Sequence, residues 1–446
     1  MDNVPEEMVA EQSSDPIEEE NNLPSIDNEL RQFIDNITSI SGTLGITMQA
    51  IFRARNKTKE QLFEFRDKNI SYQEENGKTK IVMKADCYQT YSDLTRQFRT
   101  YRLALKTIPR SYVMALISQF DAFLGKLLRI IILRKPEMLN ASEKSLSFAQ
   151  LVEFGSVEDA KEFILEKEIE TVIRKSHAEQ FDWMERKFDI SLRKGLDVWP
   201  SFIELTERRN LFVHTDGIVS DQYLKVCREH RASINEIKKG DELDVSPEYF
   251  FVAYEVIFEI AFKLAHVLWR KFMPDELMKA DSNLIDIGYD TLHDENYKQT
   301  ALIFDFATQT LKKYSSEYDR LIMVVNRALA YKWGGNDKKA RGIITQEDWS
   351  ATSGRFRLAE AVILENYELA YDIMQEIGQN FHEVGLYDYR EWPLFKEIRK
   401  ENKFLELIEK IFGEPYNKVE PENLNLPGDL ESETMAEFQS DNANCD

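Results

Sequence analysis

Long stretches of the chain contain few glycine or proline residues and repeat apolar residues at intervals of three and four. The clearest example is 247–272, PEYFFVAYEVIFEIAFKLAHVLWRKF, in which Glu255, Glu259 and Lys263 recur every four residues within an apolar run. One polar stripe on an apolar cylinder is typical of an amphipathic helix in a folded protein. The charges also argue against a membrane span. This patterning predicts a helical protein with no membrane partner.

One segment departs from the helical periodicity. Residues 69–85 place short β-prone runs on both sides of Asn76-Gly77. An Asn-Gly pair between such runs is typical of a tight β-hairpin turn. The fold class that we predict is therefore all-α, with one small β-hairpin inserted among the helices.

Capping residues and helix-breaking residues indicate where the expected helices begin and end. Ser156 and Asp159 have the spacing of a capping box, Pro200 suits a first helical turn, and Gly217 suits a helix end. A proline inside a helical pattern is expected to end the helix. The predicted helices span 28–68 with a break near Ser41-Gly42, 88–106 before Pro109, 111–134, 156–175, 199–217 and 247–272.

Negative charge is concentrated at the two ends of the chain. The chain has 79 acidic and 57 basic residues, and segments 1–27 and 413–446 are acidic and poor in aromatic residues. Such segments bury too little apolar surface to fold, so both are predicted to be disordered. Between them we expect one helical domain over 28–275 and another over 282–412. The net charge of −22 argues against a protein that coats nucleic acid with its whole surface, but it allows a local basic groove.

The three cysteines, Cys87, Cys227 and Cys445, are scattered along the chain. They show neither a disulfide framework nor the spacing of metal ligands. The first 25 residues lack the basic start and apolar run of a signal peptide. We therefore expect a reduced, cytoplasmic protein that uses neither a metal nor another cofactor.

Small residues recur at a fixed spacing within residues 282–412. Ala328 aligns with Ala359 and Ala340 with Ala370, about thirty residues apart. Small residues at such a period let paired helices approach closely, and the segment resembles degenerate tetratricopeptide repeats. A plain helical bundle with an accidental similarity is the alternative. The residues expected to close the array are Pro393, Leu394, Phe395, Ile398 and Phe404.

The stretch ERRNLFVHTDG, residues 207–217, is more polar than a core helix requires. Residues three and seven positions apart share one face of a helix, so Glu207, Asn210 and His214 form one stripe. Arg209 lies about 140° from His214 around the helix axis. Its guanidinium would meet the imidazole only by reaching around the helix or by helix distortion.

These side chains are suited to phosphoryl transfer. His214 can exchange a proton near neutral pH, because a free imidazole has a pKa of about 6.5. The planar guanidinium of Arg209 can contact a phosphate oxygen, and Asn210 can orient the ring or the phosphate. In RNA the 2′-hydroxyl is an internal nucleophile beside the phosphate. A base, a cation and correct positioning then suffice without a metal.

The sequence from Arg209-Asn210 to His214 resembles the Arg-polar-x-x-x-His motif of the HEPN superfamily, which contains helical ribonucleases and RNA-binding proteins. Long apolar helices upstream and downstream extend the resemblance over roughly 86–272. It implies that Arg209 stabilises the phosphate, Asn210 orients it and His214 acts as general acid and base. HEPN nucleases generally pair two motifs, and this chain holds one good copy. The resemblance therefore implies a homodimer.

A basic stripe supports RNA as the partner. Its members recur every three or four residues along one predicted helix and are Arg96, Arg99, Arg102, Lys106 and Arg110. Such a stripe is a suitable track for a phosphate backbone. A solvated face paired with local acids is the alternative. Two further residues, Asp121 and Glu207, are candidate auxiliary residues of the site, and for Asp121 a structural hydrogen bond is the alternative.

The predicted function is a metal-independent endoribonuclease that leaves 2′,3′-cyclic phosphate ends. The resemblance implies a toxin or an anti-phage defence effector, with a regulatory protein partner bound by the C-terminal repeats. Two alternatives remain open. One is a HEPN-like RNA-binding or scaffold protein without catalysis, and the other is a protein-interaction adaptor built on helical repeats.

Overall fold

The computed structural model describes residues 24–75, 78–141, 146–413 and 416. Within them the chain forms α-helices and one two-stranded sheet, so the predicted all-α fold with one small hairpin is confirmed. The acidic leader and tail predicted to be disordered lie outside the described residues, apart from 24–27, 413 and 416. No described helix combines the length and apolar character needed to span a membrane.

The chain divides into two compact units. Unit 1 comprises residues 1–287 and 309–319, and unit 2 comprises residues 288–308 and 320–446. The division falls inside a helix, beyond the 275–282 segment in which the sequence placed a domain boundary.

The elements that begin in unit 1 are α2 (Ile26–Asn69), β1 (Ile70–Glu75), β2 (Lys78–Met83), α3 (Tyr88–Arg134), α4 (Phe148–Glu153), α5 (Val157–Ile173), α6 (His177–Phe188), α7 (Trp199–His214), α8 (Asp221–Glu229), α9 (Pro247–Phe272), α10 (Leu277–His293) and α12 (Glu317–Trp333). Those wholly in unit 2 are α11 (Tyr297–Asp305), α13 (Asp337–Ile344), α14 (Gly354–Ile363), α15 (Tyr367–Ile377), α16 (Leu386–Glu391) and α17 (Asn402–Phe412). Short 3-10 or π turns are η1 (Ala85–Cys87), η2 (Pro136–Ala141), η3 (Pro274–Glu276), η4 (Phe306–Thr310), η5 (Pro393–Phe395) and η6 (Ile398–Lys400).

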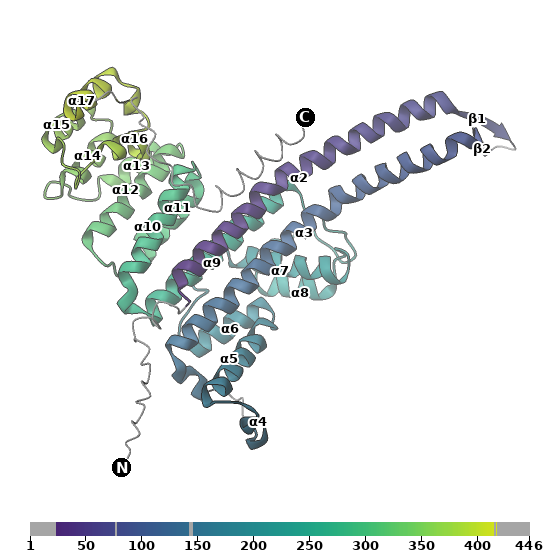
Figure 1. Ribbon diagram of the computed structural model, residues 1–446, viewed down its shortest axis with the longest axis horizontal. Helices are drawn as coiled ribbons and strands as arrows, with labels where there is room; N and C mark the ends of the chain where they lie inside the picture. Colours follow the sequence, from purple (N-terminus) through teal and green to yellow (C-terminus); the bar gives the residue numbers. More distant parts are fainter. Residues whose placement is uncertain (1–23, 76–77, 142–145, 414–415, 417–446) are drawn as a thin grey trace, which may run out of the picture. The chain divides into compact units, whose positions relative to one another are not determined.

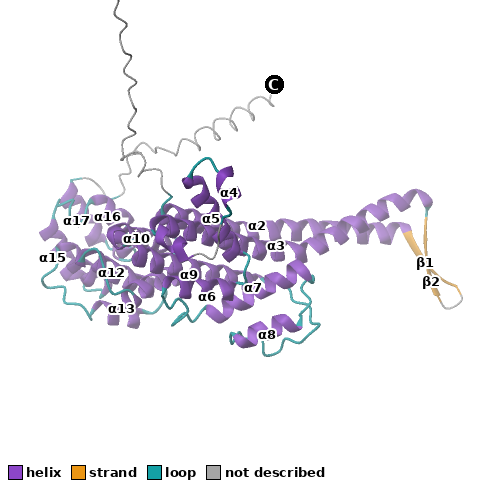
Figure 2. Ribbon diagram, turned by 90° about the horizontal axis from the view of Figure 1, so that it is seen from below, coloured by secondary structure: helices purple, strands orange, loops and turns teal. Residues whose placement is uncertain are grey.

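Two long antiparallel helices, α2 and α3, run side by side through unit 1 and extend beyond its other helices (Figures 1 and 2). We call residues 45–106, the extended part, the arm. Helix α2 continues through Gly42 and α3 continues through Pro109, so the predicted breaks at both residues are wrong. An interior proline costs a helix about 3 kcal/mol. Pro109 is buried, and the packing of α3 on its neighbours outweighs that local cost.

The predicted hairpin forms the tip of the arm (Figure 1). Strands β1 and β2 are antiparallel, and their register pairs Ile70 with Met83 and Glu75 with Lys78. The Asn76-Gly77 pair, from which the turn was predicted, lies outside the described residues. The insertion predicted at 69–85 is confirmed.

Helix α3 is the central helix of unit 1, because it packs against α2, α5, α7 and α9. Phe33 of α2 stacks on Phe123 of α3 with ring centroids 4.7 Å apart. Phe120 of α3 meets Phe202 of α7 edge to face at 5.2 Å. This aromatic core brings α3 and α7, which carry most of the predicted site residues, into direct contact.

Three turns in unit 2 share one conformation. In each, an Asn caps the second helix, and its backbone N–H donates to the carbonyl oxygen five residues earlier at 2.8 or 2.9 Å. The preceding residue has a φ of 59°, 83° or 61°. The caps are Asn296, Asn336 and Asn366. Unit 2 therefore repeats one helix–turn–helix arrangement, joining α10 to α11, α12 to α13 and α14 to α15.

The aligned alanines lie inside these hairpins. Ala340 and Ala370 each lie four residues after an Asn cap, and both are fully buried. Ala328 and Ala359 are also fully buried, but they lie eight and seven residues before their caps, so this pair is one position out of register. The likeness to tetratricopeptide repeats remains a prediction. The residues expected to close the array include four that are fully buried in the unit 2 core: Leu394, Phe395, Ile398 and Phe404.

Close packing between α10 and α11 leads to a stability prediction. An added Cβ at Gly288 would lie 2.3 Å from Cζ of Phe304, whereas one at Gly342 in α13 would have nothing within 4 Å. Gly288→Ala is expected to lower the free energy of unfolding by about 1–3 kcal/mol, as overpacking does. The control Gly342→Ala should leave it unchanged or raise it by up to about 1 kcal/mol. Urea unfolding measures both, and equal stability of the two variants would contradict the packing.

Candidate functional site

The predicted motif lies on the second half of α7. The first half is buried through Trp199, Phe202 and Ile203, and exposure increases toward the helix end at His214. Gly217 follows with φ +85°, and a Cβ there would lie 2.8 Å from the Leu243 carbonyl oxygen. Only glycine fits this turn without strain. The predicted helix end at Gly217 is thereby explained, and the motif is held where α7 leaves the core.

An aspartate from α3 connects the motif to a third helix. Asp121 Oδ2 accepts a hydrogen bond from Arg209 Nη2 at 2.9 Å, and its Oδ1 lies 2.9 Å from Nε2 of His177 in α6. The side chains of Asp121, Arg209 and His177 are 24%, 25% and 8% exposed, so the carboxylate is shielded but still reachable from solvent. Asp121 thus contacts the motif through its hydrogen bond with Arg209.

Asn210 and Glu207 extend this arrangement. Arg209 Nη1 donates to Asn210 Oδ1 at 3.2 Å, and Asn210 Nδ2 donates to Glu207 Oε1 at 3.3 Å. The two bonds orient both the amide and the guanidinium. We call the five residues that are linked in this way the Asp121 cluster: Asp121, His177, Glu207, Arg209 and Asn210.

Burial raises the pKa of Glu207, although the Asn210 hydrogen bond and the charges of His177 and Arg209 act to lower it. A carboxyl whose pKa is raised by folding binds protons more tightly in the native state, so its contribution to stability falls as pH rises from the unfolded pKa through the folded one. Glu207→Gln is therefore expected to be at least as stable as the parent at pH 7. The difference should vanish below about pH 4, where an unfolded-state Glu is protonated. Urea unfolding across this range measures it, and a Glu207→Gln variant less stable than the parent at pH 7 would contradict the reasoning.

His214 lies apart from the Asp121 cluster. Its side chain is exposed, and among the described residues it has no hydrogen bond or ion pair with Arg209 or Asn210. Arg209 instead turns toward α3, where Asp121 holds it. One chain therefore orients Arg209 and Asn210 together and presents the imidazole separately.

The predicted basic stripe divides into buried and exposed parts. Arg110 is 4% exposed and donates to acidic side chains and to the backbone carbonyls of Asp216 and Leu243. The acids that contact Arg110 are Asp216, Glu242 and Asp244. Lys106 also pairs with Glu242. These two cations hold the segment after α7 against α3, so Arg110 is not available to RNA in this conformation.

The remaining stripe residues are exposed. Arg96 pairs with Asp93 of the preceding turn at 2.9 Å. Arg99 and Arg102 have no acidic partner in the described part of the chain. The sequence-based alternative of pairing with local acids therefore applies to Arg96 alone. Lys106 and Arg110 pair with acids more than a hundred residues away, whereas Arg99 and Arg102 remain open to an anionic partner.

A second polar network on α7 was not predicted. Glu204 is 9% exposed. It accepts hydrogen bonds from Arg208 at 2.7 Å, Tyr223 at 2.7 Å and Tyr249 at 2.9 Å. Burial and the charge of Glu204 raise the pKa of Tyr223. The spacing of Glu204 and Arg208 was the only local signal, because the tyrosines come from α8 and α9. This network anchors α7 to α8 and α9.

Comparison with protein families, characterised proteins and solved structures finds no match. The chemistry of the site has to be argued from its own side chains. In the part of the chain that the structure describes, no three His, Cys, Asp or Glu side chains form a candidate metal-binding group.

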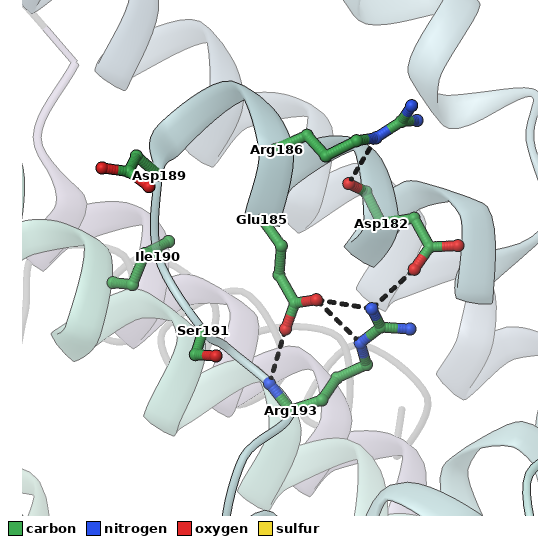
Figure 3. Close-up of a pocket in the computed structure, with 7 residues that line it drawn as sticks. All are labelled: Asp182, Glu185, Arg186, Asp189, Ile190, Ser191 and Arg193. Carbon is green, nitrogen blue, oxygen red and sulfur yellow. Dashed lines mark hydrogen bonds and ion pairs between the residues drawn. The ribbon is translucent and has the colours of Figure 1, made fainter.

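A hollow of about 780 Å³ lies beside the segment after α6 (Figure 3). Glu185 accepts hydrogen bonds there from the backbone N–H groups of Leu192 and Arg193 and from the Arg193 side chain, which also contacts Asp182. Burial acts to raise the pKa of Glu185, but these hydrogen bonds outweigh it and the pKa is lowered. The hollow shares no residue with the Asp121 cluster, and these hydrogen bonds secure the turn between α6 and α7.

Proposed function

We propose that the protein is a metal-independent endoribonuclease of the HEPN type, which cleaves RNA to a 2′,3′-cyclic phosphate and a 5′-hydroxyl end. The observation that carries the proposal is the ion pair between Asp121 and Arg209, whose nitrogen and oxygen atoms are 2.9 Å apart. Asp121 and Asn210 orient the guanidinium, and a quarter of the Arg209 side chain stays exposed. A preorganised cation of this kind stabilises the charge that develops on a phosphate during transfer.

The reaction requires two proton transfers on opposite sides of phosphorus. The 2′-oxygen forms a bond to phosphorus while the bond to the 5′-oxygen breaks. A base takes the proton of the 2′-hydroxyl, and an acid gives a proton to the leaving 5′-oxygen. One chain presents one exposed imidazole at the motif, His214. A homodimer supplies two, together with two Arg209 side chains, and this is the assembly that we propose.

The biological role that we propose rests on the HEPN resemblance. It is a cytoplasmic toxin or anti-phage defence effector. The repeated helical hairpins of unit 2 expose helix surfaces that suit a regulatory protein partner. Recovery of a stable partner by pull-down with the full chain, and its loss when unit 2 surface residues are changed, would test this part.

The nuclease proposal is tested by incubating total tRNA and a mixed-sequence RNA with the purified protein in EDTA, followed by a denaturing gel. Cleavage with cyclic-phosphate ends is expected from the parent. It is also expected from His382→Ala, a matched control whose imidazole is exposed in unit 2. His214→Ala should leave the RNA intact. Equal cleavage by His214→Ala would overturn the assignment, and sizing chromatography reports on the dimer.

A non-catalytic RNA-binding protein is the second candidate. It is favoured by the separation of His214 from Arg209 within one chain and by the neutralisation of Arg209 by Asp121. Intact RNA together with tight, salt-sensitive binding would select it. If RNA neither binds nor is cleaved and a protein partner is recovered, the helical-repeat adaptor is selected instead.

A further inference from the structure

The arm is basic, although the whole chain is strongly acidic. Residues 45–106 contain thirteen Lys or Arg residues and seven Asp or Glu residues. In the whole chain, 57 basic residues stand against 79 acidic ones. A local basic surface on an acidic protein concentrates polyanions at that surface.

The density of positive charge is highest in one short section of the arm. Segments 53–59 of α2, RARNKTK, and 96–102 of α3, RQFRTYR, contain seven cationic residues and no acidic residue. Two contacts between α2 and α3 bracket the section: the hydroxyl oxygens of Thr47 and Tyr112 are 3.1 Å apart, and the rings of Phe65 and Tyr91 stack at 6.3 Å. Because the helices are antiparallel, the two segments lie at the same level between these contacts. We call them the basic band.

The band is available to a ligand. Only Arg96 has an acidic partner, Asp93, among the described residues. The other cations of the band have none and are Arg53, Arg55, Lys57, Lys59, Arg99 and Arg102. Unpaired cations at this density repel one another, and a phosphate backbone would relieve that repulsion.

Exposed aromatic side chains flank the cations. Phe52 and Phe63 are 49% and 50% exposed. The Arg55 guanidinium carbon lies 4.8 Å from the Phe52 ring centroid, and Lys59 Nζ lies 5.6 Å from that of Phe63. Alternation of rings and cations along one helix provides stacking surfaces for unpaired bases beside charges for phosphates. A duplex hides its base faces and would leave the rings unused.

The face of α3 that carries Arg99 and Arg102 leads from the basic band toward the end of α7. On α3, Arg99, Arg102 and Arg110 share the helix face that further along, at Phe120, packs on Phe202 of α7. Arg110 contacts Asp216, two residues after His214. A strand that follows this face from the band would therefore reach the end of α7.

We propose that the basic band of the arm binds a single-stranded segment of RNA and delivers the adjoining segment to the end of α7. The phosphates contact the unpaired cations, and bases stack on Phe52 and Phe63. The proposal deepens the nuclease function and rests on it for the identity of the polymer as RNA. Binding and cleavage are separable, because the band shares no residue with the motif on α7.

The test uses the full chain and a fluorescent 2′-O-methyl RNA oligonucleotide of mixed sequence, which has no 2′-hydroxyl to attack the phosphate. The band variant combines Arg53→Gln, Lys57→Gln, Arg99→Gln and Arg102→Gln. Its matched control removes the same charge from four exposed lysines that have no acidic partner among the described residues: Lys312→Gln, Lys313→Gln, Lys338→Gln and Lys410→Gln. Fluorescence anisotropy gives Kd at several salt concentrations, and circular dichroism verifies helix content.

The band variant is expected to bind at least about 30-fold more weakly than the parent. The slope of log Kd against log salt should fall by about two to three, since each single-strand phosphate contact contributes about 0.7. The control should bind like the parent. Phe52→Ser with Phe63→Ser should weaken binding about tenfold while leaving the salt slope unchanged, because it removes stacking and no charge.

Equal binding by the band variant and the control would overturn the proposal. So would a parent preference for duplex RNA, or binding of phosphatidylserine vesicles in place of RNA, which would assign the band to a membrane surface. Failure of the nuclease function has a different result: the parent would bind the oligonucleotide more tightly than the band variant, but 2′-hydroxyl RNA would remain bound and uncleaved.

Discussion

Replacement of His214 with Ala is expected to reduce RNA cleavage at least about 100-fold, since loss of a general acid or base typically costs two to four orders of magnitude. The imidazole is exposed and has no structural partner among the described residues, so its removal disturbs no packing. Helix content and dimerisation should therefore match the parent. Circular dichroism and sizing chromatography measure both, and a gel assay with EDTA measures cleavage.

Arg209→Ala provides the second half of this test. It removes the proposed phosphate-stabilising cation, and loss of one such donor typically costs about 100-fold to 1000-fold in rate. His177 still contacts Asp121 in this variant, so the fold should persist. His382→Ala is the control for a changed imidazole elsewhere. Parental cleavage by either His214→Ala or Arg209→Ala would show that the site is wrongly assigned.

Arg110→Met is expected to lower the free energy of unfolding by about 2–4 kcal/mol, because removal of one partner from a buried charge network leaves hydrogen-bonding groups without partners. Arg110 is 4% exposed and bridges Asp216, Glu242 and Asp244, which belong to the segment after α7. Its guanidinium carbon also lies 5.1 Å from the Phe212 ring centroid. Urea unfolding measures the loss.

The matched control is Arg102→Met, which lies on the same face of α3 but is exposed without an acidic partner in the described chain. Its stability should stay within about 0.5 kcal/mol of the parent. In RNA binding the order should reverse: Arg102→Met should bind RNA more weakly than Arg110→Met, since Arg102 belongs to the basic band. Parental stability of Arg110→Met would mean that the acidic segment is not held by this cation.

Local patterning was sufficient for several individual elements. The range 247–272 was predicted as one helix and matches α9, and the hairpin lies where Asn76-Gly77 indicated a turn. Prediction failed at Gly42 and Pro109, which were expected to interrupt helices. Both residues carry a local cost, but α2 and α3 pack along one another for most of their length. The packing of α2 against α3 therefore outweighs the local tendency of Gly42 and Pro109 to interrupt a helix.

Only part of the candidate site could be predicted from the sequence. Glu207 and Asn210 were placed on one face by helical spacing, and the structure joins them by a hydrogen bond. His177 is not among the residues predicted for the site, because nothing within α6 indicates that it meets Asp121. The same applies to the basic stripe. Its spacing is evident in the sequence, but the acids that pair with Arg110 follow it by more than a hundred residues and could not be predicted from that spacing.

The sequence by itself determined the helical class, the hairpin, the approximate bounds of α5, α7 and α9, and the stripe of Glu207 and Asn210, because these depend on spacing and capping within a few residues. Only the tertiary structure decided that Asp121 orients Arg209, that His214 stays apart from that pair, and that Arg110 is buried while Arg99 and Arg102 are exposed. Periodicity states which residues share a face of one helix. Which faces meet depends on the packing of helices distant in the chain, and here the aromatic contact between α3 and α7 determines it.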